Sequence, residues 1–197
     1  MKSYTIKNNI VLFSNSCLSQ WYGAFKGQEN GQFKITWDTA INFIAYGPMP
    51  HARSYDETFQ YAKLKEIHCN CAEQAMMFSK ALLFNDMETA EKILNAKQPA
   101  EQKKLGREVK NYDDAKWNGN KFYIVCSITK AKFEQNPELK EILTKELKNY
   151  IIAEAAPWDK VWGIGLAADN PKAWDVTTWE GENLLGKALM KVREELS

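Results

Sequence analysis

The chain has 197 residues and a mass of 22.6 kDa, and its 45% hydrophobic and 26% charged residues exclude a disordered chain, a collagen and a coiled-coil rod. The 26 Lys and Arg residues balance 25 Asp and Glu residues, and the resulting net charge of +1 gives no overall attraction to nucleic acid or to an anionic membrane, although a local groove could still bind phosphates. No stretch approaches the ~20 apolar residues of a membrane-spanning helix.

The first fifty residues read as strands and turns. Short apolar runs at Ile10–Phe13, Trp21–Phe25, Phe33–Trp37 and Ile41–Tyr46 alternate with Asn, Gly and Ser, which is the pattern of strands separated by turns. The interrupted apolar run at the N-terminus does not fit a signal peptide. Gly47–Pro50 predicts a loop.

Helical patterns dominate from residue 71 onward. The segment 71–84 is apolar on nearly every helical facing, which predicts a helix buried on most sides. Asp86 is placed to cap a second helix, and Pro99 is placed to open a third. We expect a loop over 111–119 holding Trp117, then a long apolar helix that Asn136-Pro137 interrupts.

The last fifty residues combine one strand, one long loop and one helix. YIIAEA at 150–155 predicts a strand, and the segment 156–181 predicts a loop. The final segment, 182–196, carries a single apolar stripe at helical spacing and is expected to pack on the core. Because no linker divides the chain, we predict a single compact α+β domain over 1–197, mainly helical with a small β-sheet.

Two charged residues interrupt the apolar helix at 71–84. Glu73 and Lys80 lie seven residues apart, about two helical turns, and therefore share one face. Both tips could simply reach solvent at the helix edge. Alternatively, they line one pocket, where burial would raise the pKa of the carboxyl group and suit it to acid catalysis. A desolvated lysine could act as a nucleophile.

Three further segments could contact a ligand. The alternating glycines of Trp162-Gly163-Ile164-Gly165 permit a close approach of the backbone, but they are not a dinucleotide fingerprint. Asn183 either caps the last helix or marks a helix end that receives a phosphate. Arg107 is either a solvated helix arginine or a phosphate ligand.

The cysteines and the tryptophans each allow more than one interpretation. Four sparse cysteines do not form a disulfide framework, which favours a reducing, cytoplasmic location. His68-Cys69-x-Cys71 lacks the separated ligand pairs of structural zinc, and incidental thiols fit it better. Four tryptophans in one irregular stretch either pin a loop or form a wall for a planar ligand; these are Trp158, Trp162, Trp174 and Trp179.

Taken in chain order, the charged, aromatic and glycine-containing signals form one series. The series comprises Glu73-Gln74, Met76-Met77, Lys80-Ala81, Phe84, Asp86, Gly106-Arg107, Trp117, Lys132-Phe133, Asn136-Pro137, Glu154, Trp162–Gly165, Asn183–Gly186, Leu189-Met190 and Arg193. In this order it resembles the NADAR (YbiA-like) superfamily over roughly residues 13–194. Gln74 and Met77 stand where many bacterial members have His and Gln. The N-terminal SQWYGAFK is also similar to an early segment of that family.

The resemblance implies a compact α+β fold and N-glycosidase activity on a bond between ribose C1 and an amine. One branch of the family removes ADP-ribose from guanine bases, in DNA or in nucleotides, and another cleaves early riboflavin-pathway intermediates. We expect the first branch here, with no metal or other cofactor, no membrane and no obligate protein partner. The candidate catalytic residues are Glu73 and Lys80, and the candidate binding residues are Trp117, Trp162, Gly163, Gly165, Asn183, Arg107 and Asp169.

Two non-enzymatic readings remain at this point. A sensor would bind ADP-ribose or NAD in the same pocket and release no base, whereas retention of both Glu73 and Lys80 favours an enzyme. A structural partner protein would use the tryptophan loop as an interface and bind no nucleotide. The segment containing Lys103 and Arg107 could form a basic rim for nucleic acid, but its interleaved acids favour a solvated helix face.

Overall fold

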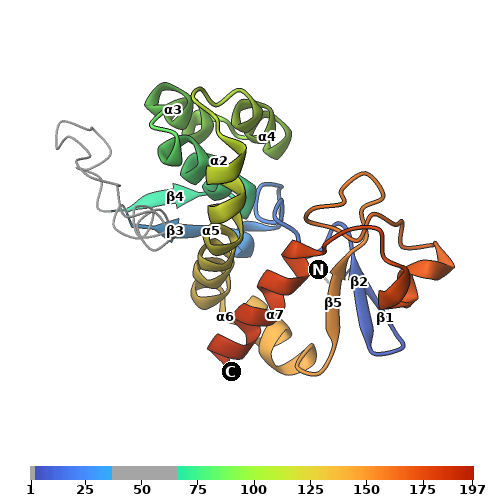
Figure 1. Cartoon of the computed structure of the whole chain (residues 1–197). Helices are drawn as coiled ribbons and strands as arrows, with labels where there is room; N and C mark the ends of the chain where they lie inside the picture. Colours follow the sequence, from blue (N-terminus) through green and yellow to red (C-terminus); the bar gives the residue numbers. More distant parts are fainter. Residues whose placement is uncertain (1–2, 37–65) are drawn as a thin grey trace.

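The computed structural model describes residues 3–36 and 66–197 of the chain. Within these ranges the molecule is an α+β protein, with long helices and two small sheets (Figure 1). This confirms the fold class predicted from the sequence. The apolar run at Ile41–Tyr46, the loop at Gly47–Pro50 and His51 lie outside the described residues.

The larger sheet has three strands in the order β1-β2-β5. β1 (Tyr4–Lys7) is antiparallel to β2 (Ile10–Phe13), and β2 is parallel to β5 (Ile151–Glu154). Apolar side chains of β2 and β5 are buried on both faces, as expected of parallel strands covered on two sides. Phe13 pairs with Glu154 in the parallel register, so β2 and β5 end side by side.

The helical half is built around α2 (Ala72–Leu83), of which every residue except Lys80 is buried. Around it pack α3 (Met87–Asn95), α4 (Pro99–Arg107) and α5 (Asp114–Gln135). The caps follow the sequence: the Asp86 carboxylate accepts the Thr89 N–H at 3.1 Å, and Pro99 occupies the first turn of α4. A two-stranded sheet lies beside α5, formed by β3 (Phe33–Ile35) and β4 (Ile67–Cys69).

The C-terminal helix α7 (Leu184–Leu196) lies against β5 and α5, and so joins the three-stranded sheet to the helical half (Figure 1). α6 (Pro137–Glu141) follows the break at Asn136, and a π-helical turn, Ile142–Glu146, continues it toward β5. The long loop before α7 contains two short 3₁₀ turns, Pro171–Trp174 and Val176–Thr178. No helix among the described residues is long and apolar enough to cross a membrane.

Two predictions about local structure are wrong. Residues 114–119 are not a loop, because α5 begins at Asp114 and carries Trp117 in its first turn. The carboxylate of Asp113 accepts the Lys116 N–H at 2.6 Å, which is a capping signal that the aromatic and glycine content of the segment obscured. The apolar run Trp21–Phe25, which was predicted to be a strand, forms turns instead and belongs to neither sheet.

Gly186→Ala is expected to destabilise the fold strongly. A Cβ at this position would lie 2.1 Å from the Ile152 carbonyl oxygen, and backbone cannot move aside without separating α7 from β5. We expect a loss of about 3 kcal/mol or more in the free energy of unfolding. Gly119→Ala is the matched control, because its Cβ would meet nothing within 4 Å, and it should gain up to about 1 kcal/mol. Urea unfolding of both variants measures this, and equal stabilities would contradict the packing described.

Candidate active site

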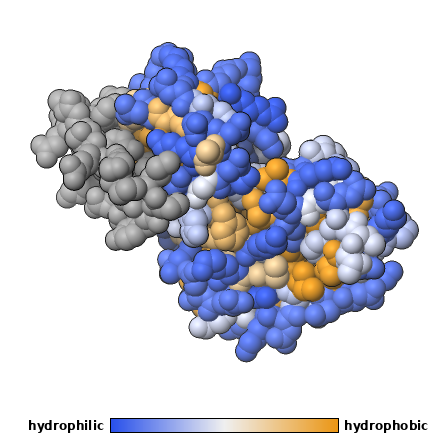
Figure 2. All heavy atoms as spheres, in the orientation of Figure 1, coloured by the Kyte–Doolittle hydropathy of each residue, from blue (hydrophilic) through white to orange (hydrophobic). Residues whose placement is uncertain are grey.

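A cavity of about 660 Å³ lies between the helical half and the parallel ends of β2 and β5. Figure 2 shows apolar atoms exposed where the helical half meets the sheet half, on a face that is otherwise largely hydrophilic. Five parts of the chain line the cavity: residues 14–21, α2, α4, residues 112–121, and the end of β5 with the loop that follows it. Its lining residues include Ser14, Asn15, Ser19, Gln20, Trp21, Glu73, Met76, Met77, Lys80, Lys103, Gly106, Arg107, Tyr112, Trp117, Asn118, Lys121, Glu154, Asp159, Lys160 and Trp162.

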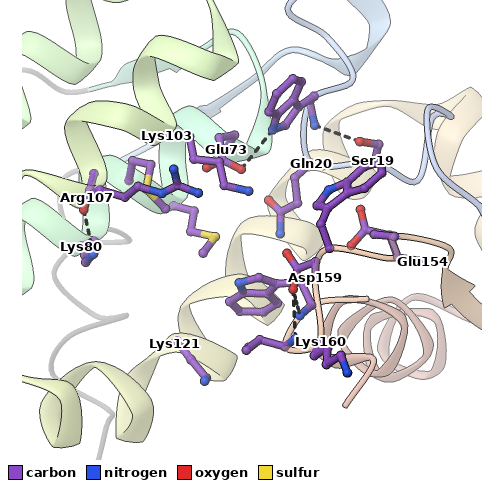
Figure 3. Close-up of a pocket in the computed structure, with 18 of the residues that line it drawn as sticks. Ser19, Gln20, Glu73, Lys80, Lys103, Arg107, Lys121, Glu154, Asp159 and Lys160 are labelled. Atoms are coloured by element: carbon purple, nitrogen blue, oxygen red, sulfur yellow. Dashed lines mark hydrogen bonds between the residues drawn. The ribbon is translucent and has the colours of Figure 1, made fainter. Parts of the chain in front are cut away.

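Glu73 projects into this cavity from the first turn of α2 (Figure 3). Its side chain is only 5% exposed, and the indole N–H of Trp21 donates a hydrogen bond to it at 3.3 Å. Burial raises the pKa of Glu73, and the charges of Lys103 and Arg107 oppose that rise only in part. Burial in the cavity wall thus favours the protonated form of the Glu73 carboxyl group, which suits it to proton donation.

A second carboxyl group, Glu154, faces the same cavity from the end of β5 (Figure 3). Burial raises its pKa to about 7, and the negative charges of Asp159 and Glu73 contribute to the increase. The negative charge of Glu73 is one cause of the raised pKa of Glu154, while burial is the largest cause for both groups. Two carboxyl groups whose protonated forms are favoured beside one cavity suit acid–base chemistry on a bound molecule.

The raised pKa of Glu154 also leads to a prediction about the pH dependence of stability. Between pH 4.5 and about 7 the folded protein keeps a proton that the unfolded chain has lost. The free energy of unfolding therefore falls as the pH rises, by up to about 3 kcal/mol. Glu154→Gln removes this titration. At pH 8 the variant should be more stable than the wild type by roughly 1–3 kcal/mol, and at pH 4 the two should match. Urea unfolding at both pH values tests this, and an equal difference at both would contradict the assignment.

Lys80 lies two turns along α2 from Glu73 and closes one side of the cavity. Its ammonium donates to the Gly106 carbonyl at 2.7 Å and lies 4.4 Å from the ring centre of Tyr112 and 5.4 Å from that of Trp117. Burial lowers the pKa of Lys80, and the positive charge of Arg107 lowers it further. The amine is thus held in place and its neutral form is made more accessible.

Aromatic rings form much of the remaining wall. Trp117 is buried in the first turn of α5, while Trp162 is partly buried in the loop after β5. Trp158 is 85% exposed and also borders the cavity. Trp174 and Trp179 pack instead against the outer face of the three-stranded sheet. The tryptophan loop therefore combines both expected uses, pinning by rings and lining a pocket.

Two cations on α4 border the cavity. Lys103 and Arg107 lie one helical turn apart and both line it, and no ion pair joins either to an acid among the described residues. Lys160, by contrast, is paired with Glu180 at 2.9 Å. The structure therefore brings together five of the candidates named from the sequence, and these are Glu73, Lys80, Arg107, Trp117 and Trp162.

Four candidates lie outside the cavity lining. The glycine at 163 allows a close approach, but to protein: a Cβ there would lie 2.9 Å from the Glu154 carbonyl oxygen. Gly165 takes a positive φ of 71° and fits against Glu180. Asp169 is exposed on the loop surface. These two glycines shape the loop itself, and the structure offers neither them nor Asp169 to a ligand in this cavity.

Asn183 holds β5 in place rather than facing a ligand. Its amide donates to the Ile152 carbonyl at 2.9 Å and its oxygen accepts the Glu154 N–H at 3.2 Å. The residue precedes α7 in a left-handed conformation, and its side chain makes no capping bond. The first amides of α7 bond to carbonyls of the preceding loop, Leu184 to Val161 and Leu185 to Trp162. They are therefore not open to a phosphate.

Gln74 and Met77, the two departures from the bacterial pattern, have different surroundings. The amide of Gln74 donates to three carbonyls at the end of α3, and its oxygen accepts the Asn70 N–H at 2.8 Å. Its role is therefore structural. Met77 lines the cavity and packs against Gly106, where an added Cβ would lie 1.9 Å from its sulfur.

The His68–Cys71 segment is structural as well. Cys69 and Cys71 are buried, and burial raises the pKa of both thiols. The Cys71 thiol donates to the Gln102 side chain at 3.3 Å. In residues 3–36 and 66–197, no three His, Cys, Asp or Glu side chains form a group that could hold a metal ion.

The sequence reading missed several lining residues, of which Glu154 has the most perturbed environment. Ligand sites in open α/β sheets gather at the carboxyl ends of parallel strands, and Glu154 and Ser14 stand at the ends of β5 and β2. An acidic residue ending a predicted strand was therefore an available signal. Trp158 was noted only as one of four clustered tryptophans, and Gln20 carried no signal of its own, because nothing local distinguishes a glutamine that faces a cavity.

Comparisons with known proteins give this arrangement a context. The family described as the NADAR domain matches residues 11–197. An N-glycosidase of Acanthamoeba polyphaga mimivirus is 48% identical over 124 residues, which are 63% of this chain and 72% of that protein. Protein irg-1 of Caenorhabditis elegans is 38% identical over 171 residues, 83% of this chain and 79% of that protein. A riboflavin biosynthesis protein of Vibrio vulnificus is 31% identical over 130 residues, 64% of this chain but 31% of that protein.

Proposed function

The chain belongs to the NADAR domain family, and from that premise we propose that it is an N-glycosidase that removes ADP-ribose from ADP-ribosylated guanine. The observation that carries the proposal is two carboxyl groups with raised pKa values, the buried Glu73 and the partly buried Glu154, facing one cavity. Hydrolysis of a glycosidic bond needs a proton donor and a carboxylate across the scissile bond. The mimivirus relative, named an N-glycosidase, supports the reaction class.

In the proposed reaction, Glu73 is the acid. The bond from ribose C1 to the amine nitrogen breaks, its electron pair stays on nitrogen, and the nitrogen takes the proton of Glu73. The carboxylate of Glu154 stabilises the positive charge that develops at C1 and accepts a proton from the water that adds there. The indole of Trp21, 3.3 Å from Glu73, stabilises the carboxylate that the acid becomes.

Lys80 has two proposed roles. As an ammonium, it orients the ribose hydroxyls from the position fixed by the Gly106 carbonyl. As a neutral amine, it attacks C1 of the opened sugar and forms a Schiff base while the base leaves with the proton of Glu73, and water then hydrolyses the C=N bond. The lowered pKa of Lys80 supports the second role, and its hydrogen bond and ring contacts support the first.

The aromatic walls suit the planar parts of such a substrate. Trp117 and Trp162 both line the cavity, and the exposed indole of Trp158 also borders it. Heterocycles stack on such rings through dispersion and offset contacts. We propose that these three tryptophans hold the adenine and the leaving base, while the cations of α4 that border the cavity hold the diphosphate.

Arg107→Gln is expected to weaken binding of ADP-ribose about 10- to 100-fold, because a guanidinium binds phosphate oxygens with charge-assisted hydrogen bonds. The loss should appear mainly in KM and in the affinity for free ADP-ribose measured by calorimetry. Lys104→Gln is the matched control, since Lys104 is exposed on the same helix and does not line the cavity. Equal affinities of the two variants would remove Arg107 from the phosphate site.

The proposed function is tested by incubating the protein with an oligonucleotide that carries ADP-ribosylated guanine and measuring free ADP-ribose. Release by the wild type, lost in Glu73→Gln, supports the proposal. Binding of ADP-ribose without release supports a sensor. Release only from early riboflavin-pathway intermediates supports the other branch, and the Vibrio vulnificus relative is named a riboflavin biosynthesis protein. If none of these ligands binds, the exposed tryptophan loop acts as a protein interface instead.

A further inference from the structure

Gln20 is a buried polar side chain in the wall of the cavity. The residue is 9% exposed, and within residues 3–36 and 66–197 neither its amide nitrogen nor its oxygen has a hydrogen-bond partner. Two other buried side chains among the described residues hold an unpaired polar atom, Ser79 and Asn120, and neither lines the cavity. A buried carboxamide with both ends unpaired is costly in a folded protein, so its position in a ligand cavity calls for a ligand that pairs with it.

Hydrogen bonds hold the backbone of the segment around Gln20. Its backbone carbonyl accepts the Glu73 N–H at 2.9 Å, and the hydroxyl of Ser19 accepts the Trp21 N–H at 3.2 Å. The buried ammonium of Lys132 donates to the carbonyls of Cys17 and Ser19 at 3.0 and 2.9 Å. These hydrogen bonds fix the backbone on both sides of Gln20. The carboxamide of Gln20 is therefore held at the cavity wall, where it can bind a ligand.

The direction of Gln20 places it at the reacting end of the cavity. Figure 3 shows its side chain directed into the space between Glu73, Glu154 and Asp159, on the far side of Glu73 from Arg107. The group that occupies this space is the part of the substrate next to the proton donor. In the proposed reaction this is the leaving heterocycle, whereas the phosphates and the adenosine lie toward α4.

We infer that Gln20 is a specificity-determining residue that binds the lactam edge of the leaving heterocycle through two hydrogen bonds. A primary carboxamide presents one N–H donor beside one C=O acceptor in a plane. A lactam, as in guanine, presents a ring N–H beside a C=O, and so matches it in reverse. This inference rests on the proposed function for the identity of the leaving group, and it adds which edge of that group the protein recognises.

The test compares guanine with 2-aminopurine, which keeps the exocyclic amine and lacks the lactam. The wild type should cleave the ADP-ribosylated guanine with a kcat/KM ~10²-fold higher than that of the 2-aminopurine analogue, because an analogue that leaves buried polar groups unpaired is rejected. In Gln20→Met, which keeps the length of the side chain and removes both polar atoms, the ratio should fall to about one. Selectivity that is unchanged in Gln20→Met overturns the inference, as does an equal loss on both substrates.

Two further measurements separate this inference from the proposed function. Calorimetry with guanosine and 2-aminopurine riboside needs no turnover: the wild type should prefer guanosine about tenfold or more, and Gln20→Met should not. A preference for guanosine without any turnover would reject the glycosidase and keep the role of Gln20. Turnover without a preference for guanosine would support the glycosidase and reject the role of Gln20. Gln20→Met should unfold at the same temperature as the wild type or higher, because it removes an unpaired buried amide. A lower temperature would indicate a structural role and overturn the inference.

Discussion

Glu73→Gln is expected to lower kcat by about 10²-fold or more while leaving substrate affinity nearly unchanged. The substitution keeps the size of the side chain and removes only the transferable proton. The Trp21 N–H, 3.3 Å away, still finds an oxygen acceptor in the new amide. The wall of the cavity therefore stays in place, and the lost interaction is one that the transition state uses. Single-turnover release of free base, together with the affinity for ADP-ribose, measures the two quantities separately.

Glu101→Gln is the matched control for this variant. Glu101 is an exposed glutamate on α4 that does not line the cavity, and its substitution should leave the rate unchanged. The pH dependence supplies a second check. Because Glu154 must be ionised and Glu73 protonated, kcat/KM of the wild type should fall on the acid side of about pH 7, where Glu154 gains a proton, and on the alkaline side of the optimum, where Glu73 loses its proton. Full activity of Glu73→Gln would assign the proton donation to another group.

The sequence was most informative where the chemistry of a residue and its helical position agree. The spacing of Glu73 and Lys80 predicted one shared face, and both line the cavity from α2. Asp86 and Pro99 were placed correctly because capping depends on residues within one helical turn. The start of α5 was missed, since the cap at Asp113 is followed by a segment whose tryptophan and glycine resemble a loop.

The rest of the site depends on contacts between distant segments. Gly163 and Asn183 showed the signals of a ligand site, a permissive backbone and a helix end, but the same features here hold the loop and β5 together. Close approach requires glycine whether the other partner is a ligand or a carbonyl of the same chain. Glu154 became a site residue only through the parallel pairing of β2 with β5, which joins segments about 140 residues apart.

Lys80→Met is expected to lower kcat/KM by about 10²-fold or more, whichever of its two roles operates. A misplaced ribose alone costs about this much, and loss of a nucleophile costs more. Lys80 is held by the Gly106 carbonyl at 2.7 Å and by the faces of Tyr112 and Trp117, so a shorter or neutral side chain cannot reproduce its position. Lys187→Met on the exposed side of α7 is the control. An unchanged rate in Lys80→Met would remove Lys80 from the reaction.

The two roles of Lys80 differ in what borohydride captures. If the amine attacks C1, reduction during turnover converts the C=N bond into a stable secondary amine between Lys80 and the ribose, which mass spectrometry locates on the peptide carrying α2. Lys80→Arg should then be inactive, because a guanidinium keeps its proton and cannot attack. If the ammonium only orients the sugar, no adduct forms and Lys80→Arg retains part of the rate through its charge. The lowered pKa of Lys80 favours the neutral amine that the first outcome requires, and the amine must give up its hydrogen bond to Gly106 to attack C1.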